Sequence, residues 1–208
     1  MSTLWAFIIR KQAKLKIFIM THPTDHAQTL RLALLEDERC RKILTHVRDL
    51  ALPDCWIGAG FVRNTIWTLL SGDKMAETTS DVDVIWFDPM RAKSELDTQT
   101  EQRLMSVEPT VPWSVKNQAR MHTRNGDEPY ISCVHALSFW PETATAVAAR
   151  LTETGEIEIL APFGLQDLFD GVLRPTPRFK QDKLNLFEKR WREKGWLEQW
   201  PFLRIVVA

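Results

Sequence analysis

Residues 56–88, with the sequence WIGAGFVRNTIWTLLSGDKMAETTSDVDVIWFD, decide how this chain is expected to fold. They begin with a short apolar run that stops at a glycine turn, Gly58-Ala59-Gly60. A helical pattern of apolar residues follows and ends at Gly72, a residue typical of helix C-termini. After a polar loop, residues 81–87 are rich in β-branched and aromatic side chains, which indicates a strand. The stretch therefore predicts a strand, a glycine turn, a helix and a second strand.

The second strand carries two aspartates. Successive strand side chains point to opposite faces, so Asp81 and Asp83 share one face, and Val82, Val84 and Trp86 take the other. Two carboxylates this close raise each other's pKa unless a positive charge lies between them. A hard divalent cation such as Mg²⁺ prefers a few carboxylates together with substrate phosphates. We therefore predict a metal site here rather than a pair of solvated strand-edge carboxylates, because unpaired buried charge is costly.

The order of these elements resembles the nucleotidyltransferase superfamily that includes DNA polymerase β and the CCA-adding enzymes. Residues 58–64 (GAGFVRN) look like the Gly-Gly-x-Val-Arg-Asp turn of the CCA-adding branch, with Asn64 where that branch has an acid. Residues 113–122, 140–146 and 161–165 look like a family of small bacterial nucleotidyltransferase-like proteins. This resemblance covers residues 30–203 and is more specific for the family than for the substrate.

The resemblance implies transfer of a nucleoside monophosphate from an NTP to an unknown acceptor, with release of pyrophosphate. Asp81 and Asp83 would be the catalytic pair, holding one or two Mg²⁺ (or Mn²⁺) ions. Gly58 and Gly60 would aim backbone N–H groups and a helix N-terminus at the leaving phosphates.

Three cationic residues are candidates for neutralising the triphosphate. Arg63 lies one helical turn beyond the glycine turn, and its alternative role is that of a surface helix arginine. Lys116 and Arg120 fall on the polar face of an alternating stretch that predicts a strand as far as about Asn117. Lys116 has an equally good alternative, a salt bridge to Asp81 or Asp83 in a protein that needs no metal.

A third metal carboxylate is expected in the wider superfamily from a later strand such as the one at residue 113. The positions offered by that strand are Ser114 and Lys116, and neither replaces an acid. Asp88, Glu108 and Asp127 are the remaining candidates, with nothing to choose among them. The alternatives are therefore a nucleotide-binding or regulatory protein that kept the fold and lost the chemistry, and a purely structural domain.

Two further features have both a functional and a packing interpretation. Trp140 and Glu142 belong to the block 140–146, where they suit a nucleotide or acceptor contact, although core packing is the favoured role for Trp140. The C-terminal helix interleaves basic and aromatic residues, as proteins that bind single-stranded nucleic acid do. Its apolar residues also form a helical stripe, so docking onto the domain is favoured over nucleic acid binding.

Composition limits the remaining possibilities. The 208 residues suit one domain, with Lys plus Arg equal to Asp plus Glu at 27 each, so charge gives no global case for a nucleic acid partner. The three widely spaced cysteines favour buried thiols in a reducing compartment over disulfides or zinc. Residues 1–20 contain short apolar patches split by basic residues, which suits an N-terminal extension or a misassigned start better than a membrane span. We expect a cytoplasmic protein with one nucleotidyltransferase-like domain over residues 21–208.

The expected fold is α/β or α+β: a small mixed sheet flanked by helices, with a helical C-terminal part over about residues 163–208. Asp25 is expected to begin a helical region broken near Glu36-Asp37, and Asp88-Pro89 to begin a polar helix. Residues 134–139 and 143–151 look helical, and residues 157–160 look like a strand. A short helix is expected at residues 167–169 and a last helix at residues 179–196.

Overall fold

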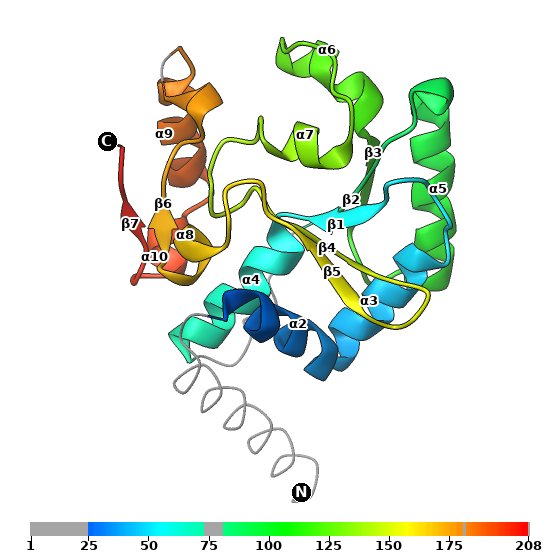
Figure 1. The fold of residues 1–208 in the computed structure, drawn as a ribbon, viewed down its shortest axis with the longest axis horizontal. Helices are drawn as coiled ribbons and strands as arrows, with labels where there is room; N and C mark the ends of the chain where they lie inside the picture. The colour runs from blue at the N-terminus through cyan, green and yellow to red at the C-terminus, as the bar shows by residue number, and fades with distance from the viewer. Residues whose placement is uncertain (1–24, 73–80, 181, 208) are drawn as a thin grey trace, which may run out of the picture.

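The computed structural model describes residues 25–72, 81–180 and 182–207, and the predicted extension over residues 1–20 lies outside them. A five-stranded mixed sheet with the strand order β3-β2-β1-β4-β5 forms the centre of the molecule (Figure 1). Strands β2 and β3 are parallel, and the other neighbouring pairs are antiparallel. The strands, in chain order, are Trp56–Gly58, Val82–Trp86, Trp113–Asn117, Ala148–Leu151 and Ile157–Leu160. The predicted mixed sheet flanked by helices is confirmed.

Helices from the N-terminal half cover one face of this sheet (Figure 1). They are α2 (His26–Glu36), α3 (Glu38–Arg48), α4 (Gly60–Ser71) and α5 (Ser94–Val107). The side chain of Asp25 accepts a hydrogen bond from the backbone N–H of Gln28 at 2.9 Å, so the predicted cap is confirmed. Apolar strand residues such as Val84 and Val115 are fully buried against these helices. This layer supplies most of the hydrophobic core.

The opposite face of the sheet is covered in part by a short helix, α7 (Cys133–Leu137). Cys133 and Leu137 pack there against Trp56, Ile85 and Ala148 in a second, smaller cluster of buried residues. A 3₁₀ turn, η2 (Gln118–Arg120), and α6 (Met121–Asn125) link β3 to this helix. The strand end that carries Asp83 lies beyond the cover of α7.

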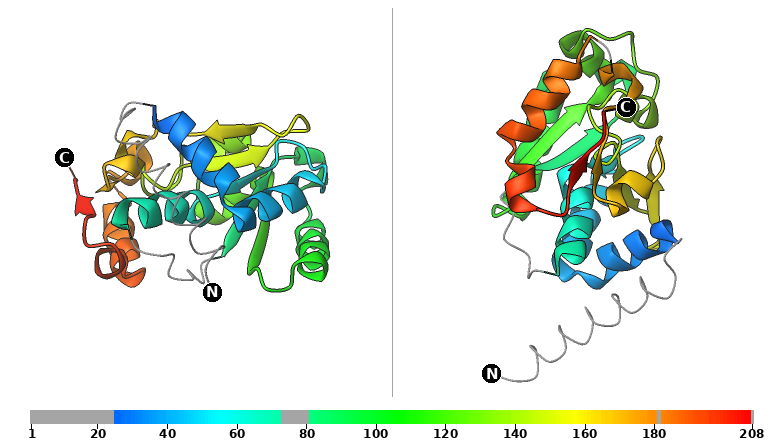
Figure 2. Two further views of the ribbon diagram at one scale, coloured as in Figure 1. Left: turned by 90° about the horizontal axis from the view of Figure 1, so that it is seen from below. Right: turned by 90° about the vertical axis from the view of Figure 1, so that its left-hand side faces the viewer.

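The C-terminal part packs against α4, through α8 (Figure 2). Its elements are α8 (Gln166–Phe169), β6 (Val172–Leu173), η3 (Pro177–Phe179), α9 (Leu184–Glu193), α10 (Trp196–Gln199) and β7 (Arg204–Ile205). Trp67 of α4 makes edge contacts with Trp196 and Trp200 at ring centroid distances of 5.8 and 5.0 Å. The indole N–H of Trp67 donates to the carbonyl of Leu168 at 3.0 Å. The tryptophans of this region therefore dock the C-terminal elements onto the domain.

The prediction of a helix over residues 143–151 is wrong. Residues 148–151 form β4, which lies between β1 and β5 in the sheet. The stretch is rich in alanine, the best helix former, but strand pairing on both sides overrides that local preference. Ala148 and Ala149 are completely buried, so small side chains suit the close packing at this strand.

Three other features of the fold also differ from the predictions. The last helix is divided, because Gly195 takes a left-handed conformation (φ 60°) between α9 and α10, and residues 177–179 form only a 3₁₀ turn. Asp88 does cap a turn that begins with a proline, but that turn is the 3₁₀ helix η1 (Pro89–Arg91), and α5 begins later at Ser94. The parallel pair β6 and β7 was not predicted, since strands of two residues give no periodicity to detect.

Cys40, Cys55 and Cys133 are all free and buried, in agreement with the expected buried thiols. None of the helices in the described part of the chain combines the length and the apolar character that crossing a bilayer requires.

Candidate active site

The central strands bring the glycine turn and the aspartate strand together. The register of β1 and β2 pairs Ile57 with Val84, so one step further Gly58 comes opposite Asp83. On the other side of β2, Asp83 pairs directly with Ser114 of β3. Opposite residues of neighbouring strands point to the same face of a sheet. Gly58, Asp83 and Ser114 therefore form a row across three strands, at the start of α4.

Among the described residues, the charges near Asp83 do not fully offset the effect of its burial and of its neighbour Asp81. Asp81 is exposed just before β2, and Asp83 is partly buried within it. Burial raises the pKa of the Asp83 carboxyl, and the negative charge of Asp81 raises it further. The charges of Arg190 and Arg63 and a hydrogen bond with Ser114 act in the opposite direction but do not reverse the shift. A bound cation would relieve this imbalance.

The donor pair fits a hard divalent cation such as Mg²⁺. Asp81 and Asp83 supply two carboxylates on one side of one strand, and Mg²⁺ commonly takes one or two carboxylates together with water and substrate phosphates. Within the described residues, no group of three or more His, Cys, Asp and Glu side chains is arranged to hold a metal ion. The remaining ligands of such an ion would have to come from substrate and solvent.

The glycine turn leaves the N-terminus of α4 open. Ala59 is the N-cap residue and makes no side-chain cap hydrogen bond, while its own N–H donates to the carbonyl of Val147 at 3.0 Å. The first backbone N–H groups of any helix lack intrahelical acceptors, and they carry the positive end of the helix dipole. Ala59 also has a positive φ of 33°, an uncommon conformation for a residue other than glycine. The turn thus presents backbone donors next to Asp83.

Gly58 has a packing role as well. A Cβ added at this position would come within 2.8 Å of Cη2 of Trp140, so the indole lies directly against the glycine. The hydroxyl of Thr176 donates to the carbonyl of Trp140 at 2.6 Å and holds this segment to the C-terminal part. Trp140 therefore has a packing role, as favoured from the sequence. It packs on the glycine turn, at the border of the site.

Arg63 is enclosed by aromatic side chains, while its charge still acts on Asp83. Its side chain is buried, and its guanidinium carbon lies 5.3, 4.7 and 5.9 Å from the ring centroids of Trp67, Trp196 and Trp200. Its Nε and Nη2 donate to Oδ1 of Asn64 at 3.0 and 2.9 Å. Burial lowers the pKa of Arg63 to about 10, which leaves it charged at neutral pH. These contacts give Arg63 a role in joining α4 to the C-terminal helices.

Lys116 lies on the predicted face of β3, but its ammonium group turns away from the aspartates. It pairs with Ile85 rather than with Asp83, and its Nζ donates to the carbonyl of Val115 at 3.0 Å. The same Nζ lies 3.8 Å from a carboxylate oxygen of Glu101 on α5.

Arg120 does not share the strand face, which corrects the expectation from the alternating pattern. The strand ends at Asn117, whose side chain caps the 3₁₀ turn that contains Arg120. The guanidinium of Arg120 pairs with the buried carboxylate of Asp97 on α5. A change from strand to turn rotates the following side chains, so period-two alternation no longer applies after the cap.

The three candidates for a third acid are each engaged elsewhere. Asp88 caps η1, the side chain of Glu108 accepts from Thr110, and Asp127 accepts a hydrogen bond from the hydroxyl of Tyr130 at 2.6 Å. Their ion-pair partners are Arg91 for Asp88, Lys42 for Glu108, and Arg178 and Lys183 for Asp127. Of the two strand positions considered for a third acid, Ser114 is the one that pairs with Asp83, and Lys116 pairs with Ile85.

The structure adds one charged pair that the sequence did not single out as a unit. Glu142 is completely buried, and its Oε1 lies 3.1 Å from Nε of Arg190 on α9. The two residues are 48 positions apart, so spacing gave no hint of their contact. The available signal was that Arg190 follows the buried Phe187 by three residues and so falls on the docking face of α9.

Comparison with known proteins agrees with this geometry. A family model described as "Nucleotidyltransferase" matches residues 45–205. A solved NMR structure, described as revealing a CCA-adding enzyme head domain, is 38% identical with a TM-score of 0.78. That match covers 87% of this chain and 96% of the other. No curated protein matches the chain.

More distant structures share the fold. The CCA-adding enzyme of Thermotoga maritima, solved with tRNA, is 16% identical with a TM-score of 0.52, over 84% of this chain and 41% of that one. A tRNA-processing enzyme, solved as a complex, is 17% identical with a TM-score of 0.50, over 79% of this chain and 43% of that one. This chain therefore spans less than half the length of these two enzymes.

Proposed function

Because the chain belongs to the nucleotidyltransferase family, whose model matches residues 45–205, we propose that it transfers a nucleoside monophosphate from an NTP to an acceptor hydroxyl. In this reaction the acceptor oxygen forms a bond to the α-phosphorus while the bond from the α-phosphorus to the β-phosphate oxygen breaks. The acceptor releases its proton, and pyrophosphate leaves. The observation that carries the proposal is the placement of Asp83 opposite the glycine turn, with Asp81 two residues away and a raised Asp83 pKa that the charges of Arg190 and Arg63 do not reverse.

The residues of the site have separate roles in this proposal. Asp81 and Asp83 would hold a divalent ion, Mg²⁺ or Mn²⁺, which would supply positive charge to the phosphoryl oxygens. Gly58 and Gly60 allow the backbone at the start of α4 to approach the phosphates, and the helix dipole favours their negative charge. Ser114 hydrogen-bonds with Asp83 and helps to orient that carboxylate.

The chemical class of the acceptor is to be found by experiment, and an RNA 3′ hydroxyl is the first class to test. The 38% identical structure is described as a CCA-adding enzyme head domain, and a distant relative was solved with tRNA. The charge balance of this chain offers no further support for RNA, so small molecules and proteins with a free hydroxyl belong in the same screen.

A nucleotide-binding protein without transfer activity is the second candidate. The observation that favours it is that neither Ser114, which pairs with Asp83, nor Lys116 can supply the third carboxylate expected from this strand. Such a protein would bind an NTP at the same turn and would not release pyrophosphate with any acceptor.

The test is thermal melting with ATP, CTP, GTP and UTP in turn, each with and without Mg²⁺ or Mn²⁺. A ligand that binds the native state raises the melting temperature by mass action. We expect a metal-dependent rise for the wild type and none for Asp81→Asn/Asp83→Asn. The matched control is Glu153→Gln/Glu156→Gln, which removes two exposed carboxylates from the turn between β4 and β5. Absence of a shift with every NTP would refute the transferase, and a shift that needs no metal would favour the binding protein.

A further inference from the structure

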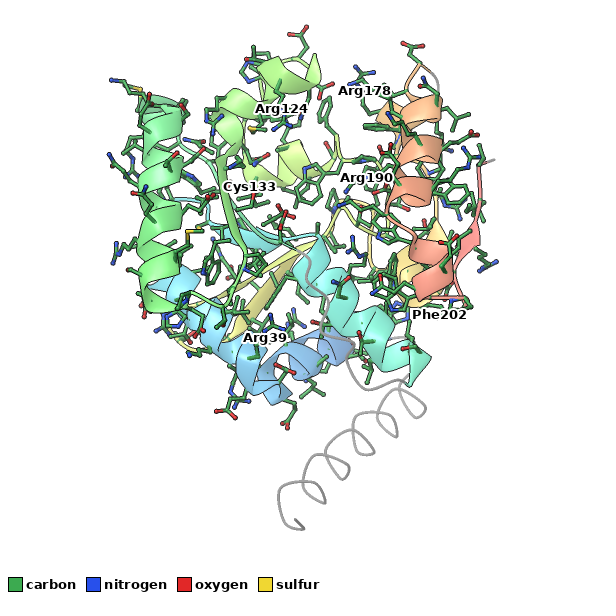
Figure 3. All side chains as sticks on the ribbon, turned by 180° about the vertical axis from the view of Figure 1, so that it is seen from behind. Arg39, Arg124, Cys133, Arg178, Arg190 and Phe202 are labelled. Carbon is green, nitrogen blue, oxygen red and sulfur yellow. The ribbon has the colours of Figure 1, made fainter. Side chains whose placement is uncertain are left out.

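Arg190 and Glu142 form a charged pair at the border of the proposed site that the reaction above does not use. Arg190 is on α9, the C-terminal helix that lies across the molecule from α5 (Figure 3). Glu142 lies two residues after Trp140, whose indole packs on Gly58 opposite Asp83, so the pair lies near the glycine turn of the site. The pair therefore brings a guanidinium from the C-terminal part to the border of the site.

Glu142 is held firmly enough to position a partner. The chain around it is tied to residues 174–176, because Thr143 N donates to the Arg174 carbonyl at 2.9 Å and Thr176 N donates to the Pro141 carbonyl at 3.0 Å. The hydroxyl of Thr145 donates to Oε2 of Glu142 at 2.6 Å. This leaves Oε1 for Arg190, whose Nε lies 3.1 Å away.

The surroundings of the two arginines differ. Arg63 is 6% exposed, and its guanidinium is enclosed by tryptophans and bonded to Asn64. The side chain of Arg190 is 37% exposed and touches one of those rings, Trp196, at 5.7 Å from the guanidinium carbon. Within the described residues, Glu142 is the ion-pair partner found for Arg190, and it contacts the inner Nε. The outer amino groups of Arg190 are thus the part of this cationic cluster that a ligand can reach.

We propose that Arg190, positioned by Glu142, is the guanidinium that contacts the phosphate chain of the nucleotide bound at Asp81 and Asp83. This inference rests on the proposed function. A guanidinium presents a planar fork of donors that matches phosphate oxygens, and the charge of the buried Glu142 carboxylate, 3.1 Å from Nε, holds that guanidinium in place. Glu142 acts through Arg190 and is a positioning residue. The C-terminal part of the chain would in this way complete a site whose carboxylates and glycine turn come from the sheet.

The test is calorimetric titration of the full chain with ATP, CTP, GTP and UTP in Mg²⁺, and with the four nucleoside monophosphates. We expect Arg190→Gln to weaken triphosphate binding about 10- to 100-fold, the range for losing a hydrogen bond to a charged group. Its effect on monophosphate binding should be smaller, Arg190→Lys should recover part of the affinity, and Glu142→Gln should lose affinity for triphosphate in the same selective way. The matched control is Arg192→Gln, on the same helix, where Arg192 pairs with Glu188 at 3.5 Å.

The outcomes separate the two proposals. Wild-type binding of no NTP would overturn the proposed function together with this one. Wild-type binding that is lost in Asp81→Asn/Asp83→Asn but unchanged in Arg190→Gln would overturn the role of Arg190 alone. Equal losses for triphosphate and monophosphate would assign Arg190 a purely structural role. If Arg190→Gln is unfolded at the assay temperature, the double variant Arg190→Gln/Glu142→Gln, which removes both charges, replaces it. The same selective loss of triphosphate binding is then expected.

Discussion

Strand β2 has a carboxylate environment at each end, and the two environments differ in how the negative charge is balanced. At the carboxyl end, the buried Asp97 of α5 accepts hydrogen bonds from the indole N–H of Trp86 at 2.8 Å and from the backbone N–H of Asn117 at 3.0 Å. The guanidinium of Arg120 pairs with the same carboxylate. At the amino end, Asp83 has a second carboxylate, Asp81, as its neighbour, and its pKa is raised.

The difference separates a structural carboxylate from a candidate functional one. A buried carboxylate whose charge is met by donors from three elements stabilises the fold and has little capacity left for a ligand. A carboxylate placed next to a like charge does not help the protein fold, so its surroundings favour the arrival of a cation. The following changes test this contrast, from the largest expected effect to the smallest.

Asp97→Ala should lower the free energy of unfolding by about 4 kcal/mol, because it leaves Arg120 without its partner and Trp86 without its acceptor in a buried place. Asp83→Asn, at the other end of the strand, should change it by less than about 1 kcal/mol. Urea unfolding measures both. If the two variants lose similar amounts of unfolding free energy, the carboxylates at the two ends of β2 do not differ in their contribution to stability.

Gly58→Ala should cost about 1–3 kcal/mol, because the new methyl group comes within 2.8 Å of the Trp140 ring. Most of that cost should disappear when Trp140 is also changed to leucine, which makes room for the methyl group. A double-mutant cycle of unfolding free energies measures this coupling. If the two substitutions have additive effects, the cost of Gly58→Ala does not come from contact with the Trp140 ring.

Asp127→Asn tests a paired carboxylate far from either end of β2, where Asp127 joins the segment after α6 to Arg178 and Lys183. Burial raises the pKa of Asp127, but hydrogen bonds with Tyr130 and Arg178 and the charge of Lys183 outweigh it and lower the pKa overall. A lowered folded-state pKa gives stability that is present above the unfolded value of about 3.9 and is lost as the pH falls through the folded value. The variant should therefore be less stable by about 2 kcal/mol at pH 7.

The same sign predicts that the stability difference between Asp127→Asn and the wild type shrinks as the pH is lowered from 5 toward 3. Urea unfolding at several pH values measures it. A difference that stays constant over this range would mean that the charge of Asp127 does not contribute.

Ala59→Gly should raise the melting temperature by about 1–3 °C, because glycine adopts a positive φ without the cost that alanine incurs at φ 33°. The matched control is Ala51→Gly, at φ 51° in the loop before β1. Differential scanning calorimetry compares them. A lower melting temperature for Ala59→Gly would show that the turn beside Asp83 is held by more than its backbone conformation.

Local signals predicted the elements on which the site is built. The glycine turn, the helix that ends at Gly72 and the aspartate strand were each expected from residues 56–88, because turn, cap and strand preferences act over a few neighbours. Local signals failed where tertiary pairing decided the outcome, as at β4, whose alanines favour a helix in isolation. They also failed at Arg120, because the cap at Asn117 ends the strand before its alternation reaches that residue.

The sequence by itself determined the pair of aspartates, their common face and the turn that precedes them, since a strand and a glycine turn fix these within one local stretch. Only the tertiary structure decided which arginine side chains are enclosed and which stay partly exposed. Arg63 and Arg190 are 127 residues apart, yet Trp196 lies beside both guanidinium groups. The reason is that charge balance and burial depend on which distant segments pack together, and the docking of α9 encloses one arginine and leaves the other partly open.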